Sequence, residues 1–160
     1  MLSIQFICVG KMKEKFYIDG AAEYAKRLNA YCKLTITELP EERLPDNPSR
    51  AQIDGALEKE ATLILSKLPK GGRVVALCVE GKPLSSEKLA ETVREWTVNG
   101  ASQITFLIGG SYGMHPSVKE RADLRLSMSP MTFPHHLARV MVLEQIYRAF
   151  KINEGSSYHK

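Results

Sequence analysis

The chain has 160 residues, of which 44% are hydrophobic and 25% are charged, and its formal net charge at pH 7 is +4. This composition is typical of one globular domain with a sizeable apolar core, and it excludes wholesale disorder. The small positive charge permits an anionic partner such as nucleic acid but does not require one.

Three cysteines, Cys8, Cys32 and Cys78, lie in or beside apolar runs, and their spacing indicates neither a zinc knuckle nor a redox pair. Reduced, buried thiols and a cytoplasmic location are therefore expected. The first residues lack the basic start and the cleavage pattern of a signal peptide. No apolar stretch approaches the length of a membrane span, so no membrane contact is expected.

Apolar runs alternate with helical periodicities in the first half of the chain, which is typical of an α/β sheet protein. A strand is predicted over 2–9 and a helix over 17–28. The alternation of apolar residues and threonine over 34–37 predicts a strand that is half exposed or at a sheet edge. Three prolines over 40–48 indicate a loop, and Ser49 is a candidate cap for a helix that ends before a Gly-Gly pair.

The second half is more apolar. The uninterrupted run over 74–79 predicts a central parallel strand that is covered on both faces. The further expected elements are a helix that starts at Ser85 or Ser86 and ends at Asn99-Gly100, a buried strand over 104–108, a short helix from Pro116, a strand over 124–128 and a last helix whose first residue is Pro134. That last helix is apolar on nearly all sides, so we expect it to be buried on two sides, the second one by a partner subunit.

Glycines follow the strand over 104–108, in the segment Gly109-Gly110-Ser111-Tyr112-Gly113. Glycines at the carboxyl end of a buried parallel strand let the main chain approach a ligand, although a plain tight turn explains the same residues equally well. The spacing differs from that of the dinucleotide-binding fingerprint, and no acidic residue follows at the distance that would suit a ribose.

The same segment matches the Gly-x-Ser-x-Gly nucleophile elbow of serine hydrolases. Ser111 would be the nucleophile, Asp123 the acid, and His135 or His136 the base. Two features argue against this alternative, because the next helix is delayed until Pro116 and no separate glycine-rich loop supplies an oxyanion hole. A small serine hydrolase therefore stays open as a minor alternative.

Two adjacent histidines, His135 and His136, open the last helix. Adjacent helical residues point about 100° apart, so the pair does not share one metal ion well, and no metal site is expected. Arg139 lies one turn further along, where a buried helix carries few charges unless each has a partner or a ligand. Arg139, Arg148 and Lys151 either form a solvated flank or hold phosphate.

Several ordered motifs extend from Ile104 to the end of the chain. They are Ile108-Gly109-Gly110-Ser111-Tyr112-Gly113, Leu126-Ser127-Met128-Ser129-Pro130-Met131-Thr132-Phe133-Pro134-His135, Arg139, Glu144-Gln145-Ile146-Tyr147-Arg148-Ala149 and Tyr158-His159-Lys160. With Val9-Gly10-Lys11, Glu80-Gly81-Lys82 and the overall length, they resemble the ribosomal large-subunit RNA methyltransferase H family. The resemblance extends over essentially the whole chain, and Tyr112 stands where the family varies.

The resemblance implies a fold and an activity. The fold is the α/β SPOUT methyltransferase fold, with a mostly parallel sheet flanked by helices and a C-terminal trefoil knot, an element that chain-topology rules alone would not suggest. One domain over 1–160 is implied, with the cofactor-binding knot region at about 74–155. The implied activity is S-adenosylmethionine-dependent methylation of N3 of a pseudouridine in 23S ribosomal RNA. The implied enzyme is a homodimer that acts on the assembled ribosome, at a stem-loop facing the small subunit.

The resemblance also assigns the cofactor-binding residues. These are Leu77, Gly109, Met128, Ser129, Pro130, Met131, Thr132 and Phe133. The physical chemistry agrees, because main-chain groups at adjacent strand ends can hold adenine and ribose while Leu77, Met131 and Phe133 supply apolar walls.

The implied reaction needs an aligned nucleophile and a way for the N3 proton to leave. His159 and Arg139 are the candidates for this task, and Tyr158 is the candidate for positioning or stacking on the base. The tail lies far along the chain from the other site residues, so we expect it to complete the pocket of a partner subunit. The small net charge and the absence of an appended RNA-binding domain favour recognition of an assembled ribosome over naked RNA. A catalytically silent ribosome-binding dimer remains a further alternative.

Overall fold

The computed structural model describes residues 1–160 and consists of five strands and five helices. In chain order these are β1 (Ser3–Val9), α1 (Lys15–Leu28), β2 (Lys33–Leu39), α2 (Arg50–Lys67), β3 (Arg73–Pro83), α3 (Ser86–Val98), β4 (Gln103–Ile108), α4 (Pro116–Arg121), β5 (Leu124–Ser127) and α5 (His135–Asn153). The α/β class and the order of the elements agree with the sequence prediction.

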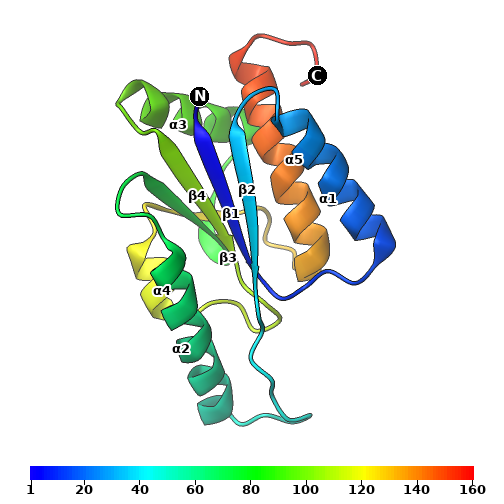
Figure 1. Ribbon diagram of the computed structural model, residues 1–160, viewed down its shortest axis with the longest axis vertical. Coiled ribbons are helices and arrows are strands. Elements are labelled where there is room, and N and C mark those ends of the chain that lie inside the picture. Colours follow the sequence, from blue (N-terminus) through cyan, green and yellow to red (C-terminus); the bar gives the residue numbers. More distant parts are fainter.

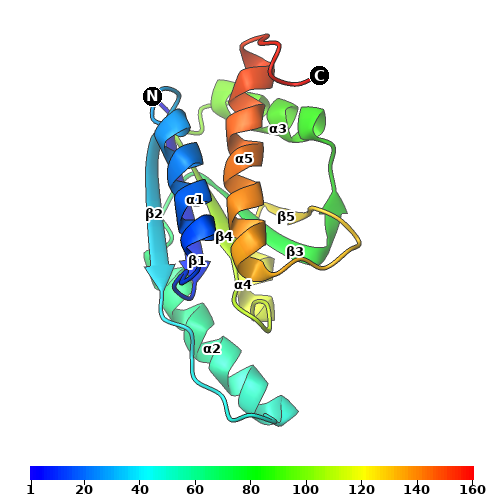
Figure 2. The same ribbon diagram turned by 90° about the vertical axis from the view of Figure 1, so that its right-hand side faces the viewer.

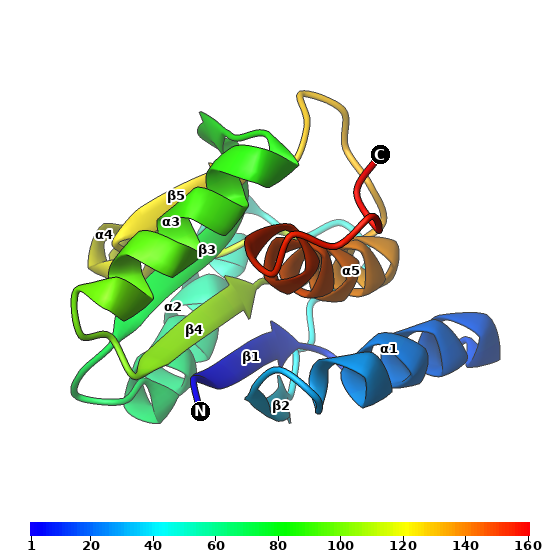
Figure 3. The ribbon, with the colours of Figure 1, turned by 90° about the horizontal axis from the view of Figure 1, so that it is seen from above.

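The five strands form one parallel sheet in the order β2-β1-β4-β3-β5. Figure 1 shows the first four of these strands, and Figure 3 shows all five. The strand that was expected at an edge, β2, is an edge strand. The strand that was expected at the centre, β3, is internal, but β4 is the middle strand of the five. Because all strands run in the same direction, their carboxyl ends meet along one edge of the sheet.

Helices cover both faces of this sheet, as Figures 1, 2 and 3 show from three sides. Residues of β1 alternate between the faces: Ile4 and Phe6 pack with α1, α3 and α5, whereas Ile7 and Val9 pack with α2 and α4. The two cores follow from this period of two. The larger core lies under α5, which is packed between α1 and α3.

Local capping explains where two of the helices begin. The Ser49 hydroxyl accepts from the Gln52 amide at 3.1 Å, and the Gln52 side chain accepts from the Ser49 amide at 2.8 Å, which completes a capping box for α2. Ser85, one of the two expected residues, caps α3. Pro134 has a non-helical ψ of 137°, so it is the cap of α5 and His135 is the first helical residue, one position later than predicted.

The apolar circumference of α5 is covered largely within its own chain. No side chain from 135 to 152 is exposed, because α1 flanks one side, α3 flanks the other, and the sheet lies beneath. Most of the coverage of α5 therefore comes from its own chain, and the expectation that a partner subunit covers a further side stays a prediction.

Strand β3 is longer than predicted and contains an irregularity. Leu77 and Lys82 both align with Leu126 of β5, so the residues between them arch out of the ladder. The run over 74–79 was expected to be buried along its whole length. It is buried only from Val74 to Ala76, and Val79 is 54% exposed. A Cβ at Gly81 would lie 2.7 Å from the Arg125 carbonyl oxygen, so the arch closes only with glycine there.

We expect Gly81→Ala to lower the free energy of unfolding by about 1–3 kcal/mol, because the new methyl group forces β3 and β5 apart. Gly55→Ala is the matched control, since Gly55 lies inside α2 with nothing near its missing Cβ. That control should stabilise the protein by about 0.5–1 kcal/mol. Urea unfolding measures both changes, and equal stabilities would contradict the tight approach at Gly81.

Candidate functional site

A cavity of about 280 Å³ lies at the carboxyl edge of the sheet, between the ends of β3 and β4 and the segment that joins β5 to α5. Of the eight predicted cofactor-binding residues, seven line it: Leu77, Gly109, Met128, Ser129, Met131, Thr132 and Phe133. Pro130 does not line the cavity. The structure thus brings together three segments that begin at Leu77, Gly109 and Met128, which are 32 and 19 positions apart in the chain.

The glycine segment after β4 forms the base of this cavity. Gly110 and Gly113 form an antiparallel bridge, and a Cβ on Gly109 would collide with the Gly113 carbonyl. The Glu41 carboxylate stabilises the turn, because it accepts a hydrogen bond from the Ser111 amide at 3.1 Å. A Cβ at Gly110 would lie 2.5 Å from that carboxylate, so glycine permits this support.

The segment over 128–134 forms the opposite wall. It is held by its own polar groups: the Ser127 hydroxyl donates to the Ser129 carbonyl at 3.2 Å, and the Met131 amide donates to the Ser129 hydroxyl at 3.0 Å. Its tip is exposed, and Met131 lies at the mouth of the cavity with Val79 and Tyr112. Three exposed apolar side chains around one opening are typical of a ligand site.

Polar side chains that were not among the predicted cofactor-binding residues complete the lining. Glu80 pairs with Lys119, which holds the pKa of that carboxyl below its usual range. Burial lowers the pKa of His135, helped by the neighbouring His136, so that imidazole is neutral at pH 7 and does not repel a cationic ligand. The motif Glu80-Gly81-Lys82 could have indicated that Glu80 belongs to the site. Lys119 lies in α4, and no motif around it in the sequence indicates a role in the site.

Arg139, a predicted catalytic residue, is only 1% exposed and does not line the cavity. Its guanidinium donates to Glu38 at 2.6 Å and to the carbonyls of Val9 and Gly10 at 3.3 and 3.0 Å. Its Nε atom is buried without a partner. The buried charge therefore has the partner that its position required, and it ties α5 to the ends of β1 and β2.

The serine hydrolase alternative is wrong. Asp123 lies at the opposite end of the sheet, where its carboxylate accepts from the Val74 amide at 2.8 Å and pairs with Arg73. His136 bonds to Glu14, and no histidine bonds to Ser111. The three members of the proposed triad are therefore not assembled.

The C-terminal tail folds back onto α5 of its own chain. The Tyr158 hydroxyl donates to Glu144 at 3.2 Å, and the Tyr158 ring packs edge-on against Tyr147. Arg148 donates to the same Glu144 carboxylate oxygen at 2.5 and 2.9 Å and lies over the Tyr158 ring. Several contacts thus give the tail a defined position.

This position is remote from the cavity in the same chain. The cavity contains His135 at the start of α5, whereas the tail lies against Arg148, thirteen residues further along the helix. At 1.5 Å per residue these two places are about 20 Å apart. Figure 2 shows the tail and the start of α5 at opposite ends of that helix. The structure does not bring Tyr158 and His159 to the predicted cofactor residues of their own chain.

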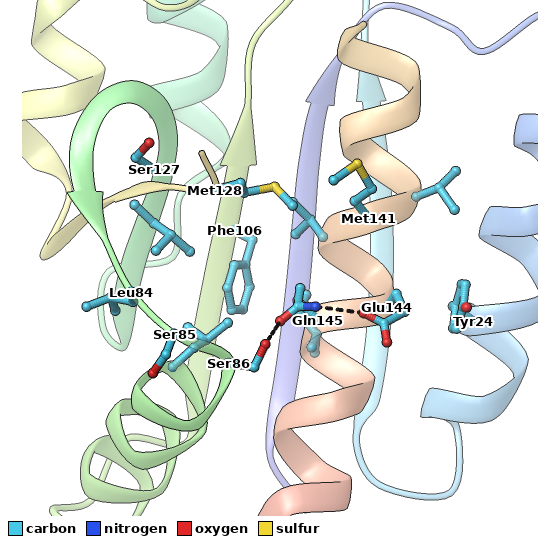
Figure 4. A pocket seen from close by; sticks show the side chains of 15 residues that line it. Tyr24, Leu84, Ser85, Ser86, Phe106, Ser127, Met128, Met141, Glu144 and Gln145 are labelled. Carbon is cyan, nitrogen blue, oxygen red and sulfur yellow. Dashed lines mark hydrogen bonds between the residues drawn. The ribbon is translucent and has the colours of Figure 1, made fainter. Parts of the chain in front are cut away.

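A second cavity of about 390 Å³ lies between α3, β4 and α5, beside the first one (Figure 4). Leu84, Phe106, Met128 and Met141 are among its apolar lining residues, and Met128 belongs to both cavities. Its polar lining includes Ser86, whose hydroxyl donates to the Gln145 side chain at 2.6 Å.

A parallel α/β sheet whose carboxyl edge carries a partly apolar cavity is the architecture of a small-molecule-binding enzyme. The family model described as predicted SPOUT methyltransferase matches residues 2–159. Proteins named ribosomal RNA large subunit methyltransferase H from Levilactobacillus brevis and Clostridioides difficile are each 48% identical over 159 residues, which are 99% of this chain and all of the relative. The chain therefore belongs to the SPOUT methyltransferase family, among these methyltransferase H proteins, and it is a methyltransferase.

Other comparisons agree with this assignment. The relative of the same name from Streptococcus sanguinis is also 48% identical, over the same shares of both chains. A solved structure of a probable methylase family protein from Haemophilus influenzae matches with a TM-score of 0.53 and 15% identity, over 98% of this chain and 70% of that one. That similarity shows the fold alone. The family resemblance predicted from the sequence is confirmed, and SPOUT methyltransferases in general use S-adenosylmethionine.

Two other properties follow from the side chains and helices. No three residues among histidine, cysteine, aspartate and glutamate gather as a metal ion would require. None of the helices combines the length and the apolar character needed to cross a bilayer.

We expect Arg139→Ala to lower the free energy of unfolding by about 3 kcal/mol, because it leaves two buried carbonyls and Glu38 without their donor. Arg94→Ala, at an exposed position on α3, is the control and should change stability by less than about 0.5 kcal/mol. Thermal and urea unfolding measure both. A stability loss no larger than that of the control would contradict the supporting role of Arg139.

Proposed function

We propose that the protein transfers a methyl group from S-adenosylmethionine to N3 of a pseudouridine in 23S ribosomal RNA. One observation carries this proposal: residues at seven of the eight positions expected to bind the cofactor gather around one cavity, in a chain of the methyltransferase H group. We infer one domain over 1–160 whose cofactor-binding region, about 74–155, is tied in the trefoil knot that the family implies.

The cavity suits the cofactor. Its volume of about 280 Å³ is close to the lower end of the usual range for small-molecule sites, and its mouth is open. Leu77 and Phe133 offer apolar surface for an adenine ring, and the turn at Gly109 offers main-chain groups. The neutral His135 leaves the site compatible with the positive charge of a sulfonium.

The bound cofactor supplies an activated methyl group, so the protein needs to align the base, exclude water and accept the proton that leaves N3. We assign the proton-accepting task to His159 and the positioning of the base to Tyr158, whose hydroxyl and ring are already held by Glu144 and Tyr147. The burial of Arg139 gives it a supporting role instead of contact with the base.

The separation of about 20 Å between the tail and the cavity of the same chain favours a homodimer in which each tail completes the partner's site. The second cavity supports this arrangement, because it is an open apolar surface beside both α5 and the first cavity. We propose that a second copy of the chain covers it. Burial of such a surface drives association.

The proposed substrate is the assembled ribosome in the cytoplasm. Because the net charge is only +4, electrostatic attraction contributes little to the affinity of the chain for free RNA. Contacts with both ribosomal subunits at the intersubunit stem-loop would supply the missing recognition.

We expect tritiated methyl groups to enter ribosomes purified from a strain that lacks this protein, at a single pseudouridine of 23S RNA, and much faster than they enter isolated 23S RNA. Nucleoside mapping after nuclease digestion identifies the modified atom. Equal rates on ribosomes and on isolated RNA would overturn the proposed substrate, and ribosome binding without any methyl incorporation or cofactor binding would indicate a silent binding protein instead.

Removal of Tyr158, His159 and Lys160 should abolish turnover and leave cofactor binding largely unchanged, because the tail is assigned to the base and its proton, whereas the cofactor is assigned to residues that line the cavity. Isothermal titration with S-adenosylmethionine measures the binding, and the ribosome assay measures turnover. Full activity of the truncated chain would refute the role of the tail, as would a particle that is strictly monomeric in solution.

A further inference from the structure

Glu87, on the first turn of α3, contacts the tail of its own chain. Its Oε1 atom lies 2.6 Å from Nε2 of His159. The end of α3 that carries Glu87 is fixed to α5, because the neighbouring Ser86 donates to Gln145. Figure 4 shows this bond between α3 and α5. The main chain at Glu87 is therefore anchored to α5, the helix on which the tail folds back.

The two neighbours of the His159 ring determine which nitrogen carries the proton. An arginine only donates, so Nδ1, which lies 3.0 Å from Arg148, is the acceptor. A carboxylate only accepts, so Nε2 carries the proton and donates it to Glu87. The lone pair of the neutral imidazole is therefore on Nδ1.

The side chains that bond to the ring nitrogens are Arg148 of α5 and Glu87 of α3. Glu144 is engaged by Arg148 and by the Tyr158 hydroxyl, so it is not available to His159. Glu87 is thus the carboxylate that orients the ring. The hydrogen bond from His159 holds the pKa of Glu87 below its usual range, so this carboxylate is ionised at neutral pH.

We propose that Glu87 is a positioning residue for methyl transfer: it orients His159 of its own chain so that Nδ1 can accept the N3 proton in the site of the partner. This inference rests on the proposed function. The N3 proton goes to Nδ1, which gives up its bond from Arg148. The methyl group forms its new bond to N3 as its bond to the cofactor sulfur breaks. The imidazolium keeps its Nε2 proton and still donates it in a hydrogen bond to Glu87. The negative charge of Glu87 balances the positive charge of the ring.

Glu87→Asp separates this role from a general effect on α3. Aspartate keeps a negative charge at the start of the helix, where it favours helix stability, but it is one methylene too short to reach His159. We expect kcat to fall about tenfold, with unchanged cofactor affinity and an unchanged unfolding midpoint. Glu87→Gln, which keeps an accepting oxygen, should retain more activity than Glu87→Asp.

Glu91→Asp is the matched control, because Glu91 also lies on α3 but bonds to Lys88 and not to the tail. It should leave kcat unchanged. Backbone heteronuclear relaxation at His159 and Lys160 provides a readout that is independent of activity. Glu87→Asp should increase the motion of the tail, and Glu91→Asp should not. Unchanged tail motion in Glu87→Asp would overturn the proposal.

Mixed dimers test whether Glu87 acts within its own chain. One subunit carries Leu77→Arg, which puts a cation into the cofactor cavity, and the other lacks Tyr158 to Lys160. Two different affinity tags allow isolation of the mixed dimer, in which the tail of the first subunit and the cavity of the second form the single complete site.

Glu87→Asp placed on the tail-bearing subunit should lower methyl transfer about tenfold, and on the truncated subunit it should have no effect. Equal effects on the two subunits, or none on either, would overturn the proposal. A failure of the proposed function is recognised separately, because the truncated homodimer would then keep full activity while Glu87→Asp still increased the motion of the tail.

Discussion

The parallel pairing of β4 with β3, and of β3 with β5, is the constraint on which the candidate site depends. It places Leu77, Gly109 and Met128 at one edge of the sheet although they are far apart in the chain. Parallel strands need crossover connections, and here α3 and α4 provide them. The same crossovers leave the carboxyl edge free for the glycine turn and for the segment over 128–134, so a ligand can be held between main-chain groups that no single segment could present.

Helix α5 connects the two functional regions of the molecule. Its first turn carries His135 at the cavity, Arg139 fixes it to the ends of β1 and β2, and Arg148 holds the tail about 20 Å away. A rigid rod of this kind suits a two-subunit site, because it holds the tail at a fixed distance from its own cavity and presents it to another one. In this arrangement the proposed proton acceptor and the residue that positions the base both belong to the tail. Side chains of α3 and α5 position the tail, and the cavity of the same chain does not.

Arg139 shows how a residue type can mislead when only the chain is known. A charged residue one turn from two histidines on an apolar helix predicts a partner or a ligand, and both explanations fit the pattern. The structure supplies the partner, Glu38, together with two main-chain carbonyls. Ser111 shows the same effect, because the elbow pattern is present in the chain while Asp123 lies at the other end of the sheet. Long-range geometry, which local patterns do not contain, decided both cases.

The sequence by itself determined the α/β class, the order of the elements, the edge position of β2, the caps at Ser49 and Ser85 and the family, because periodicity, capping and motif order are local properties of a chain. Tertiary structure alone decided that β3 arches at Gly81, that Lys119 meets Glu80 at the cavity and that Glu87 meets His159. Lys119 and Glu80 are 39 positions apart, and His159 and Glu87 are 72 positions apart. The geometry of all three contacts depends on how whole elements pack. No spacing along the chain encodes such a distance, since it is set by the close packing of the sheet and its helices.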